Sequence, residues 1–392
     1  MKKVKLASIF VSLLVTAGVM AGCNSEKAST SGGEGSKVIK IGANLELSGG
    51  VASYGQSIKE GIELAIDEIN KDGIDGKKLK LVPVDNKSDA AEATNGAIKL
   101  INQDKVAAII GSATSTNTLA QVQIANENKV PLITPTGTNP TVTVKDGKLN
   151  DFVFRTCFID PFQGTVAANF ASKELNVKNA AVLIDSSSDY AKGLAASFKA
   201  AFTKNGGKVV SEEAYVAKDT DFHATLTRIK SSKPDLVFLP GYYEEVGLIV
   251  KQARELGLTV PFIGGDGWDS PKLIELGGKD ALNNTFITNH YSSSDSDQKV
   301  QDFVKAFKDK YDGKSPDAFN ALGYDSAYFL ADAIKRAGST DAKQIQKALA
   351  ETDGLSLVSG TLKLDKNHDP IKSAVILEYK DGEQTFKTKV NP

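Results

Sequence analysis

The chain has 392 residues, of which 41% are hydrophobic and 24% charged, and its 47 lysines and arginines nearly balance its 48 acidic residues. This length predicts two domains with ample apolar core. The balanced charge provides no basic field of the kind that attracts nucleic acid, so we expect no nucleic-acid partner.

The amino terminus has the pattern of a lipoprotein signal peptide. Three lysines within the first five residues precede an apolar stretch, residues 6–20, and the small residues Ala21 and Gly22 stand directly before Cys23. Met20 departs from the leucine that is usual in this motif. We predict a signal peptide over residues 1–22, a lipid on Cys23, and an extracytoplasmic protein anchored to the cell membrane. The alternative is a plain secretory signal followed by a chance cysteine.

Residues 24–36 are rich in Ser and Gly and contain no large apolar side chain. Such a segment behaves as a flexible tether, here between the lipidated Cys23 and the folded part of the chain. With Cys23 lipidated, Cys157 has no cysteine partner within the chain, and we expect it to be a small buried apolar residue.

The alternation of strands and helices begins at residue 38. Strand-then-helix order predicts a parallel sheet with helices on both faces. Expected strands of this first series are residues 38–45, 79–85, 106–110, 130–134 and 152–155, and the helical patterns between them are residues 58–69, 90–103 and 119–125.

The segment 111–138 is the strongest candidate for a binding site. Gly111 ends a buried strand, and a row of small hydroxylated residues then opens a helix, whose first N–H groups and positive dipole end favour a carboxylate or phosphate. A second polar loop, residues 135–138, leaves the next strand. Ligands of open α/β sheets bind at the carboxyl ends of strands. The first candidates for ligand binding are Ser115, Thr116, Thr136 and Thr138. Any one of them could equally be an ordinary helix cap or turn residue.

The same alternation then repeats, which predicts a second, similar lobe. Its expected strands are residues 180–185, 208–215, 236–239, 261–264 and 285–288, and its helices are residues 162–175, 191–205, 222–231 and 244–256. A polar stretch, residues 291–298, is a candidate return connection. Helical patterns at residues 300–311, 318–337 and 342–351 then predict that the chain crosses back to the first lobe before a last strand at residues 374–379.

Chemistry for catalysis or metal binding is not apparent in the sequence. The histidines His223, His290 and His368 stand singly without metal-ligand spacing. No phosphate-binding loop, dinucleotide motif or nucleophile elbow occurs. We therefore expect no metal, no cofactor and no enzymatic activity.

Several short segments resemble a known family in the same order along the chain. They include I-K-I-G-A-N-L-E-L-S-G, I-I-G-S-A-T-S-T-N-T, P-L-I-T-P-T-G-T-N-P, P-D-L-V-F-L-P-G-Y-Y-E-E and F-I-G-G-D-G-W. Over residues 37–379 the chain resembles the type I solute-binding proteins of ABC transporters, specifically the branched-chain amino acid (Leu/Ile/Val) binding group. The resemblance implies an α/β fold of two Rossmann-like, doubly wound lobes joined by a three-crossing hinge, with the ligand in the cleft between them.

The resemblance also implies a role for each candidate in the first lobe. Ser115, with Thr116 beside it, stands where the family binds the ligand carboxylate. Thr136 occupies the position that offers a backbone carbonyl to the ligand ammonium, and Thr138 the position that gives a hydroxyl and an N–H to the carboxylate. Tyr54 matches the aromatic residue that packs on the ligand side chain.

In the second lobe the resemblance points to one acid and two tyrosines. Asp266 aligns with the acidic residue that pairs with the ligand ammonium, which is commonly the longer Glu in relatives. Tyr190 and Tyr242 match two tyrosines of the binding cleft, with packing between the lobes as the alternative role. Tyr324 is a weaker candidate for lining the cleft.

Together these features predict a monomeric substrate-binding component of an ABC importer that delivers a free amino acid, Leu, Ile or Val, to a membrane permease and its ATPase. The lobes are predicted at residues 37–156 plus 292–373 and residues 157–291 plus 374–392. An amino-acid sensor that feeds a signalling partner is the alternative function, and a different amino acid or a small carboxylate is the alternative ligand.

Overall fold

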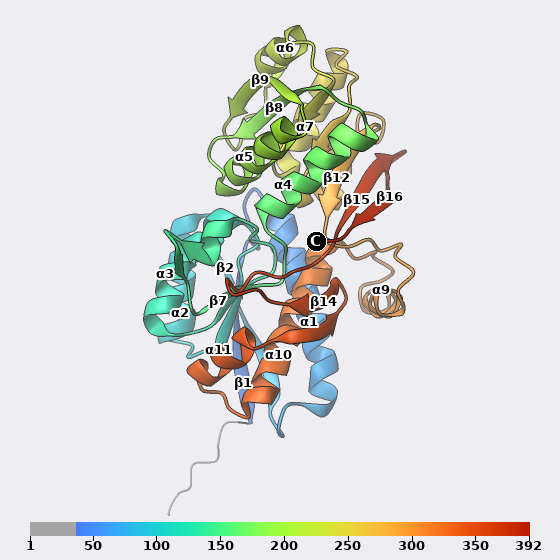
Figure 1. Ribbon diagram of the computed structural model, residues 1–392. Helices are drawn as coiled ribbons and strands as arrows, with labels where there is room; N and C mark the ends of the chain where they lie inside the picture. The colour runs from blue at the N-terminus through green and yellow to red at the C-terminus, as the bar shows by residue number, and fades with distance from the viewer. Residues whose placement is uncertain (1–36) are drawn as a thin grey trace, which may run out of the picture. The chain divides into compact units, whose positions relative to one another are not determined.

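The computed structural model describes residues 37–392 and contains two large, separate β-sheets, each covered by helices (Figure 1). This arrangement confirms the predicted fold class. The predicted signal peptide, Cys23 and the tether lie outside the described residues. Among residues 37–392, no helix is both long enough and apolar enough to cross a membrane.

The first sheet is entirely parallel and has the order β2-β1-β3-β4-β7. Its strands are β1 (Val38–Leu45), β2 (Lys78–Asp85), β3 (Ala108–Gly111), β4 (Leu132–Thr134) and β7 (Val153–Arg155). Every residue of the central strands β3 and β4 is buried, as expected for strands covered on both faces, and every residue of the edge strand β7 is buried as well. A small antiparallel hairpin, β5 (Val144–Lys145) with β6 (Lys148–Leu149), lies between β4 and β7 in the chain.

The second sheet has the order β16-β15-β12-β11-β10-β8-β9 and is mixed. Its parallel strands are β8 (Asn179–Asp185), β9 (Lys208–Tyr215), β10 (Leu236–Phe238), β11 (Phe262–Gly264) and β12 (Thr285–Asn289). Two antiparallel strands, β15 (Ala374–Lys380) and β16 (Glu383–Val390), extend it at the β12 edge. The second lobe is therefore not a copy of the first.

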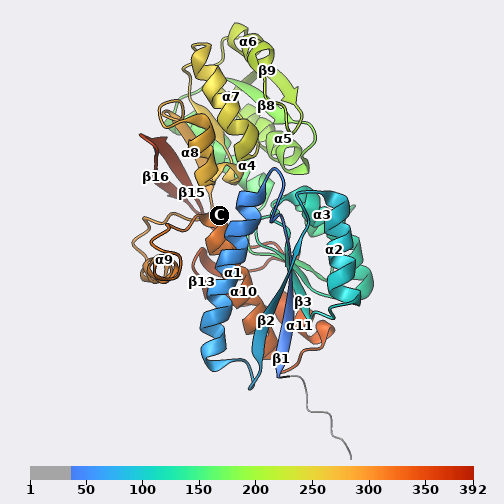
Figure 2. The ribbon, with the colours of Figure 1, turned by 180° about the vertical axis from the view of Figure 1, so that it is seen from behind.

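Helices cover both faces of each sheet. Figure 2 shows β1, β2 and β3 between α1 and α10 on one side and α2 and α3 on the other. The bounds are α1 (Ala52–Asp72), α2 (Ala90–Asn102), α3 (Ser115–Asn128), α9 (Gln298–Lys310), α10 (Ala318–Ala337) and α11 (Ala342–Ala350). In the second lobe they are α4 (Asp160–Asn169), α5 (Asp189–Lys204), α6 (His223–Ser231), α7 (Tyr243–Glu255) and α8 (Pro271–Gly277).

The pleat of β10 shows how one strand supports two cores. Leu236 and Phe238 pack in the cluster formed with α4 and α5, whereas Val237 packs in the cluster formed with α6, α7 and α8. All three residues are fully buried. The continuous apolar run is thus explained by helices on both faces of the strand.

The chain passes between the two sheets three times. It leaves the first sheet after β7, returns after β12 to form α9, α10 and α11, and passes to β15 after a hairpin of β13 (Asp353–Leu357) and β14 (Gly360–Lys363). The predicted return of the helical block to the first lobe is confirmed, because α10 packs against α1. The exact lobe boundaries stay a prediction, since residues 37–392 form one compact unit.

A buried ion pair ties the first crossing to the third. Arg155, at the end of β7, is fully buried, and its Nε lies 2.9 Å from Oδ1 of Asp369, which precedes β15. The guanidinium also donates to the carbonyl oxygens of Gly137 at 2.7 Å and Asn139 at 3.0 Å. One side chain therefore fixes both crossings and the polar loop that follows β4.

Removing this side chain should be costly. Arg155→Ala leaves Asp369 without its ion-pair partner, and we expect a loss of about 3 to 5 kcal/mol in the free energy of unfolding. Arg228→Ala is the matched control, because its ion pair with Glu213 is on the surface and its loss should change the free energy of unfolding far less. Urea denaturation measures both, and equal losses would contradict the role given to Arg155.

Candidate functional site

The two polar loops singled out in the sequence meet at a small pocket between the two lobes. We call it the inner pocket. Loops after the neighbouring strands β3 and β4 form one wall, and the starts of α5, α7 and the short helix Asp266–Trp268 form the other. Its lining residues are Tyr54, Ala113, Thr114, Ser115, Thr136, Tyr190, Tyr242, Asp266, Gly267 and Phe319.

The first wall presents unpaired backbone donors at the start of α3. Thr114 caps the helix by accepting from the Asn117 N–H at 3.4 Å, and the buried carboxylate of Glu46 accepts from the N–H groups of Ala113 at 2.9 Å and Thr114 at 3.1 Å. Within residues 37–392, the N–H groups of Ser115 and Thr116 have no acceptor. These two donors, with the helix dipole, can bind an anionic group.

Gly111 makes this loop possible. Its φ is 132°, in a region that favours glycine, and a Cβ atom there would lie 2.2 Å from the carbonyl oxygen of Asn44 in β1. The chain can therefore turn sharply out of β3 while remaining against β1.

The loop after β4 contributes a free carbonyl group. The Thr136 hydroxyl donates to the Ala113 carbonyl at 2.7 Å, and no group within residues 37–392 donates to the Thr136 carbonyl. Thr138 is buried but does not line the inner pocket, and its hydroxyl has no partner of normal geometry. Thr116 lies towards the cleft mouth, where its hydroxyl donates to Asp189 at 3.2 Å.

Aromatic rings form the apolar part of the inner pocket. Tyr54 stacks on Phe319 with ring centroids 4.2 Å apart, and Tyr190 stacks on Tyr242 at 5.4 Å. The Tyr54 hydroxyl, from the first lobe, donates to the Gly267 carbonyl of the second. Tyr324 does not reach this pocket, because it packs on Phe303 and donates to Glu68 at 2.6 Å.

Asp266 is the anionic group of the inner pocket and is only 4% exposed. Its Oδ1 accepts from Tyr190 at 2.9 Å and Gln163 at 2.8 Å, and its Oδ2 accepts from Nε2 of His290 at 2.9 Å. Burial lowers the pKa of His290 to about 4, so the ring is neutral at pH 7 and its Nε2–H is the donor. A carboxylate offers about four acceptor positions, which leaves one free on Oδ2.

The structure brings together Tyr54, Ser115, Thr136, Tyr190, Tyr242 and Asp266 from the sequence-based candidates. Sequence reasoning missed Glu46, Gln163, His290 and Phe319. Gln163 and Phe319 were visible only as members of helical patterns, and His290 only as an isolated histidine after a strand. Their positions depend on packing between segments that are far apart in the chain.

The inner pocket is nearly filled by its own side chains. About 10 Å³ remains for the centre of a water molecule, enough for about one water. An amino acid therefore needs the lobes to part or the tyrosines to move before it can enter.

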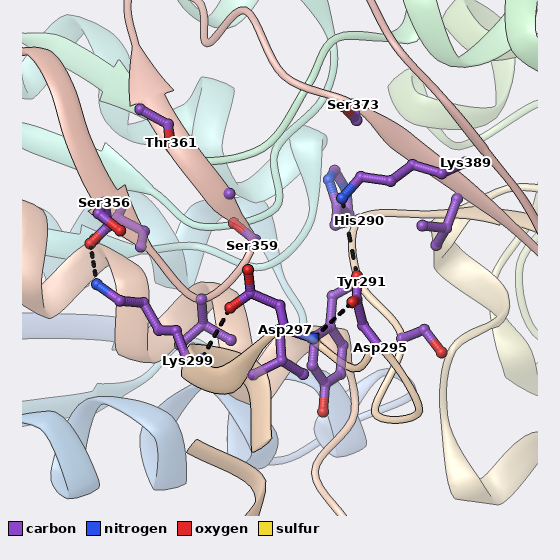
Figure 3. A pocket seen from close by; sticks show the side chains of 16 residues that line it. His290, Tyr291, Asp295, Asp297, Lys299, Ser356, Ser359, Thr361, Ser373 and Lys389 are labelled. Atoms are coloured by element: carbon purple, nitrogen blue, oxygen red, sulfur yellow. Dashed lines mark hydrogen bonds and ion pairs between the residues drawn. The ribbon is translucent and has the colours of Figure 1, made fainter. Parts of the chain in front are cut away.

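His290 also lines a larger cavity of about 110 Å³, shown in Figure 3. The charged groups on its wall are engaged with one another or with the backbone: Lys389 lies 3.8 Å from Asp295, and Lys299 donates to the Ser356 carbonyl at 2.9 Å (Figure 3). This cavity offers no unmatched charge for a zwitterion, so the inner pocket is the better candidate site. Over residues 37–392, no group of three or more His, Cys, Asp or Glu side chains could hold a metal ion.

Comparison with known proteins gives consistent results. The periplasmic binding protein family model matches residues 38–384. The chain is 32% identical over 347 residues to Leu/Ile/Val-binding protein homolog 3 of Brucella melitensis, covering 88% of this chain and 92% of that protein.

Two crystal structures have similar folds. The leucine-binding protein LivK of Thermotoga maritima has a TM-score of 0.86 and 42% identity, covering 90% of this chain and 99% of that chain. The substrate-binding protein LivJ of Streptococcus pneumoniae, in complex with isoleucine, has a TM-score of 0.85 and 38% identity, covering 91% of this chain and 100% of that chain.

Asp160 lies beside the inner pocket and should make the stability of the protein depend on pH. It is fully buried, neither of its oxygens has a hydrogen bond of normal geometry, and burial raises its pKa from 3.8 to about 8 with the Thr138 hydroxyl offsetting only part of the shift. Folding therefore takes up a proton between pH 3.8 and about 8. The contribution of Asp160 to the free energy of unfolding falls as pH rises through that range.

Asp160→Asn removes this proton uptake. We expect the variant to exceed wild type in Tm by at least about 2 °C at pH 7, with the difference widening towards pH 8 and vanishing below pH 4. Differential scanning calorimetry across this pH range measures it. A wild-type protein that is the more stable at pH 8 would show that the Asp160 carboxylate is paired.

Proposed function

The chain belongs to the periplasmic binding protein family, and we propose that it is the extracytoplasmic substrate-binding component of an ABC importer for a free branched-chain amino acid. The observation that carries this proposal is the pairing of opposite chemistries across the inner pocket. The unpaired N–H group of Ser115 belongs to the first-lobe wall, with that of Thr116 next to it towards the cleft mouth, and the Asp266 carboxylate belongs to the second-lobe wall. These groups match the carboxylate and ammonium of an α-amino acid.

The ligand side chain is proposed to pack on aromatic rings. Tyr54, Phe319, Tyr190 and Tyr242 provide apolar faces and leave few polar atoms to satisfy a polar side chain. The complex of LivJ with isoleucine supports an aliphatic ligand. Because one methylene in an apolar pocket changes binding by only about 1 to 3 kcal/mol, overlapping affinities for Leu, Ile and Val are expected.

Thr136 and Thr138 complete the proposed first-lobe contacts. The Thr136 carbonyl has no donor within residues 37–392, so it is available to the ammonium alongside Asp266. Thr138 is proposed to support the loop after β4 from the side away from the ligand, since its buried hydroxyl lies near Asp160 and away from the inner pocket.

The partners proposed are a membrane permease with its ATPase. The similarity to LivJ, which is named as a branched-chain amino acid transporter substrate-binding protein, supports transport over sensing. Purification of the membrane complex distinguishes the two: a permease and ATPase are expected with transport, and a signalling receptor with sensing.

Binding should depend on Asp266 more than on Ser115. Asp266→Ala removes the buried acceptor for the ammonium, and we expect leucine affinity to fall by roughly a hundredfold or more. Ser115→Ala removes one hydroxyl but keeps the backbone donors, so the loss should be about 1.5 to 3 kcal/mol.

Isothermal titration calorimetry of both variants with leucine tests this ranking. Asp280→Ala is the control, because Asp280 is exposed on the second lobe and does not line the inner pocket. Near wild-type affinity in a folded Asp266→Ala protein would mean that the ammonium is held elsewhere and would refute the proposed site.

The lipid anchor is a separate proposal that rests on the sequence before Cys23. Cys23→Ala removes the acylated thiol, and we expect the protein to move from the membrane fraction to the soluble or secreted fraction. Even one acyl chain holds a protein on a membrane only marginally. The Cys23→Ala variant lacks both the thioether lipid and the processed amino terminus, so we expect it to be released fully. Fractionation after high-salt washing is the measurement, and a variant that stays in the membrane fraction would exclude the anchor.

A further inference from the structure

A second cavity, which we call the outer cavity, adjoins the inner pocket. The two share Thr114 and Tyr242, and the outer cavity has a volume of about 220 Å³. Both lobes line it, through residues near the starts of α1, α2 and α3 and through the loops after β8, β9 and β10. It is therefore part of the same cleft, on the far side of the Tyr242 ring.

The second-lobe wall of the outer cavity carries three carboxylates. Asp185 is 2% exposed and Glu245 is 5% exposed, and Glu244 stands beside Glu245 at the start of α7. Lys218 is the cationic residue of the lining, and within residues 37–392 it forms no ion pair with any of the three. The wall thus carries more acidic than basic groups, and Lys218 compensates only part of the charge at Glu244.

Each carboxylate keeps at least one oxygen without a hydrogen-bond donor. Asp185 accepts only at Oδ1, from the N–H and hydroxyl of Ser187, and Glu245 accepts at Oε1 from the Lys218 N–H at 2.7 Å. Glu244 accepts no hydrogen bond within residues 37–392. Burial raises the pKa of both glutamates, and the Lys218 ammonium offsets only part of that shift at Glu244.

A buried carboxylate costs free energy unless a donor or a cation satisfies it. Two carboxylates that are more than nine-tenths buried, each with an unpaired oxygen on one cavity, call for a ligand with several donors and a positive charge. An ammonium group has three donors and no acceptor. We propose that the outer cavity binds an alkylammonium group, held by Asp185, Glu244 and Glu245.

This ammonium group could come from two sources with the same chemistry. One is the side chain of a basic amino acid whose α-carbon groups occupy the inner pocket, and this source rests on the proposed function. The other is a free diamine that occupies the outer cavity by itself. The first ligand must pass Tyr242 and compete with leucine, whereas the second can bind beside leucine.

The experiment uses the folded protein and three probes: leucine, lysine and cadaverine. Calorimetric titrations compare wild type with Asp185→Asn and Glu244→Gln, neither of which lines the inner pocket. Asn retains an acceptor for Ser187, and Glu244 has no hydrogen bond to lose, so both variants should fold. Glu255→Gln is the matched control, since Glu255 is exposed at the other end of α7.

We expect lysine or cadaverine to bind wild type and the Glu255→Gln control equally. Loss of one charged partner should weaken that binding by roughly tenfold to a hundredfold in Asp185→Asn and Glu244→Gln. Leucine affinity should stay within about twofold in both variants. Competition between lysine and leucine assigns the basic amino acid, and simultaneous binding of cadaverine and leucine assigns the free amine; either result supports the proposal.

The proposal is overturned if neither amine binds wild type, or if amine binding is the same in all variants. The proposed function fails separately, if leucine does not bind wild type. Cadaverine has no carboxylate and does not need the inner pocket, so its titration tests the outer cavity even in that case.

Discussion

A carboxylate buried in the cleft constrains much of the second lobe. Asp266 can remain there because three donors reach it from separate segments: Gln163 on α4, Tyr190 at the start of α5, and His290 after β12. These segments are brought together by the parallel order of β8, β10, β11 and β12. The same carboxylate is close to saturation, so a ligand ammonium either takes the last position on Oδ2 or displaces a donor. Selectivity for a compact cationic group follows from that limited space.

Buried charge also fixes the crossings between the lobes. Arg155 and Asp369 pair across the first and third crossings, and Lys372 donates to the Thr156 carbonyl at 3.1 Å and to Ser359 at 2.6 Å. Burial lowers the pKa of Lys372 to about 8 although Asp325 opposes the shift. Such charges are expensive to leave unpaired, so they hold the crossings between the lobes in one arrangement.

The sequence was informative where local pattern decides structure. β1, β9 and α10 have the predicted bounds. β1 and α10 are long apolar patterns with clear ends, whereas β9 is a mixed segment of which only Tyr215 is buried. β16 was missed: its residues alternate with little burial, and the signal was the Asp381-Gly382 turn, with φ of 53° and 87°, that joins it to β15. α8 was missed because it is short and begins at a proline.

For the site, the loops after β3 and β4 were predictable, because small polar residues directly after a buried strand predict a ligand-binding loop at the carboxyl edge of the sheet. The partners of Asp266 were not, because their proximity depends on packing between distant segments. Glu46 illustrates the same limit: an acidic residue after a strand is usually exposed, yet here it is fully buried and binds the N–H groups of Ala113 and Thr114. It thereby removes two donors from the set that the helix start would otherwise offer a ligand.

The contacts between lobes determine what a ligand must contribute. Tyr54 already donates to the Gly267 carbonyl and accepts from the Tyr243 N–H at 3.2 Å, and Ser53 and Ser270 lie 2.8 Å apart. These bonds favour contact between the lobes without any ligand. A ligand therefore stabilises the closed arrangement only by what it adds beyond them, and it adds most when its two charges satisfy groups on opposite lobes. An uncharged analogue of the same shape would fill the aromatic pocket but leave the helix donors and Asp266 without new partners, so the zwitterion, more than the side chain, supplies the differential affinity for the closed state.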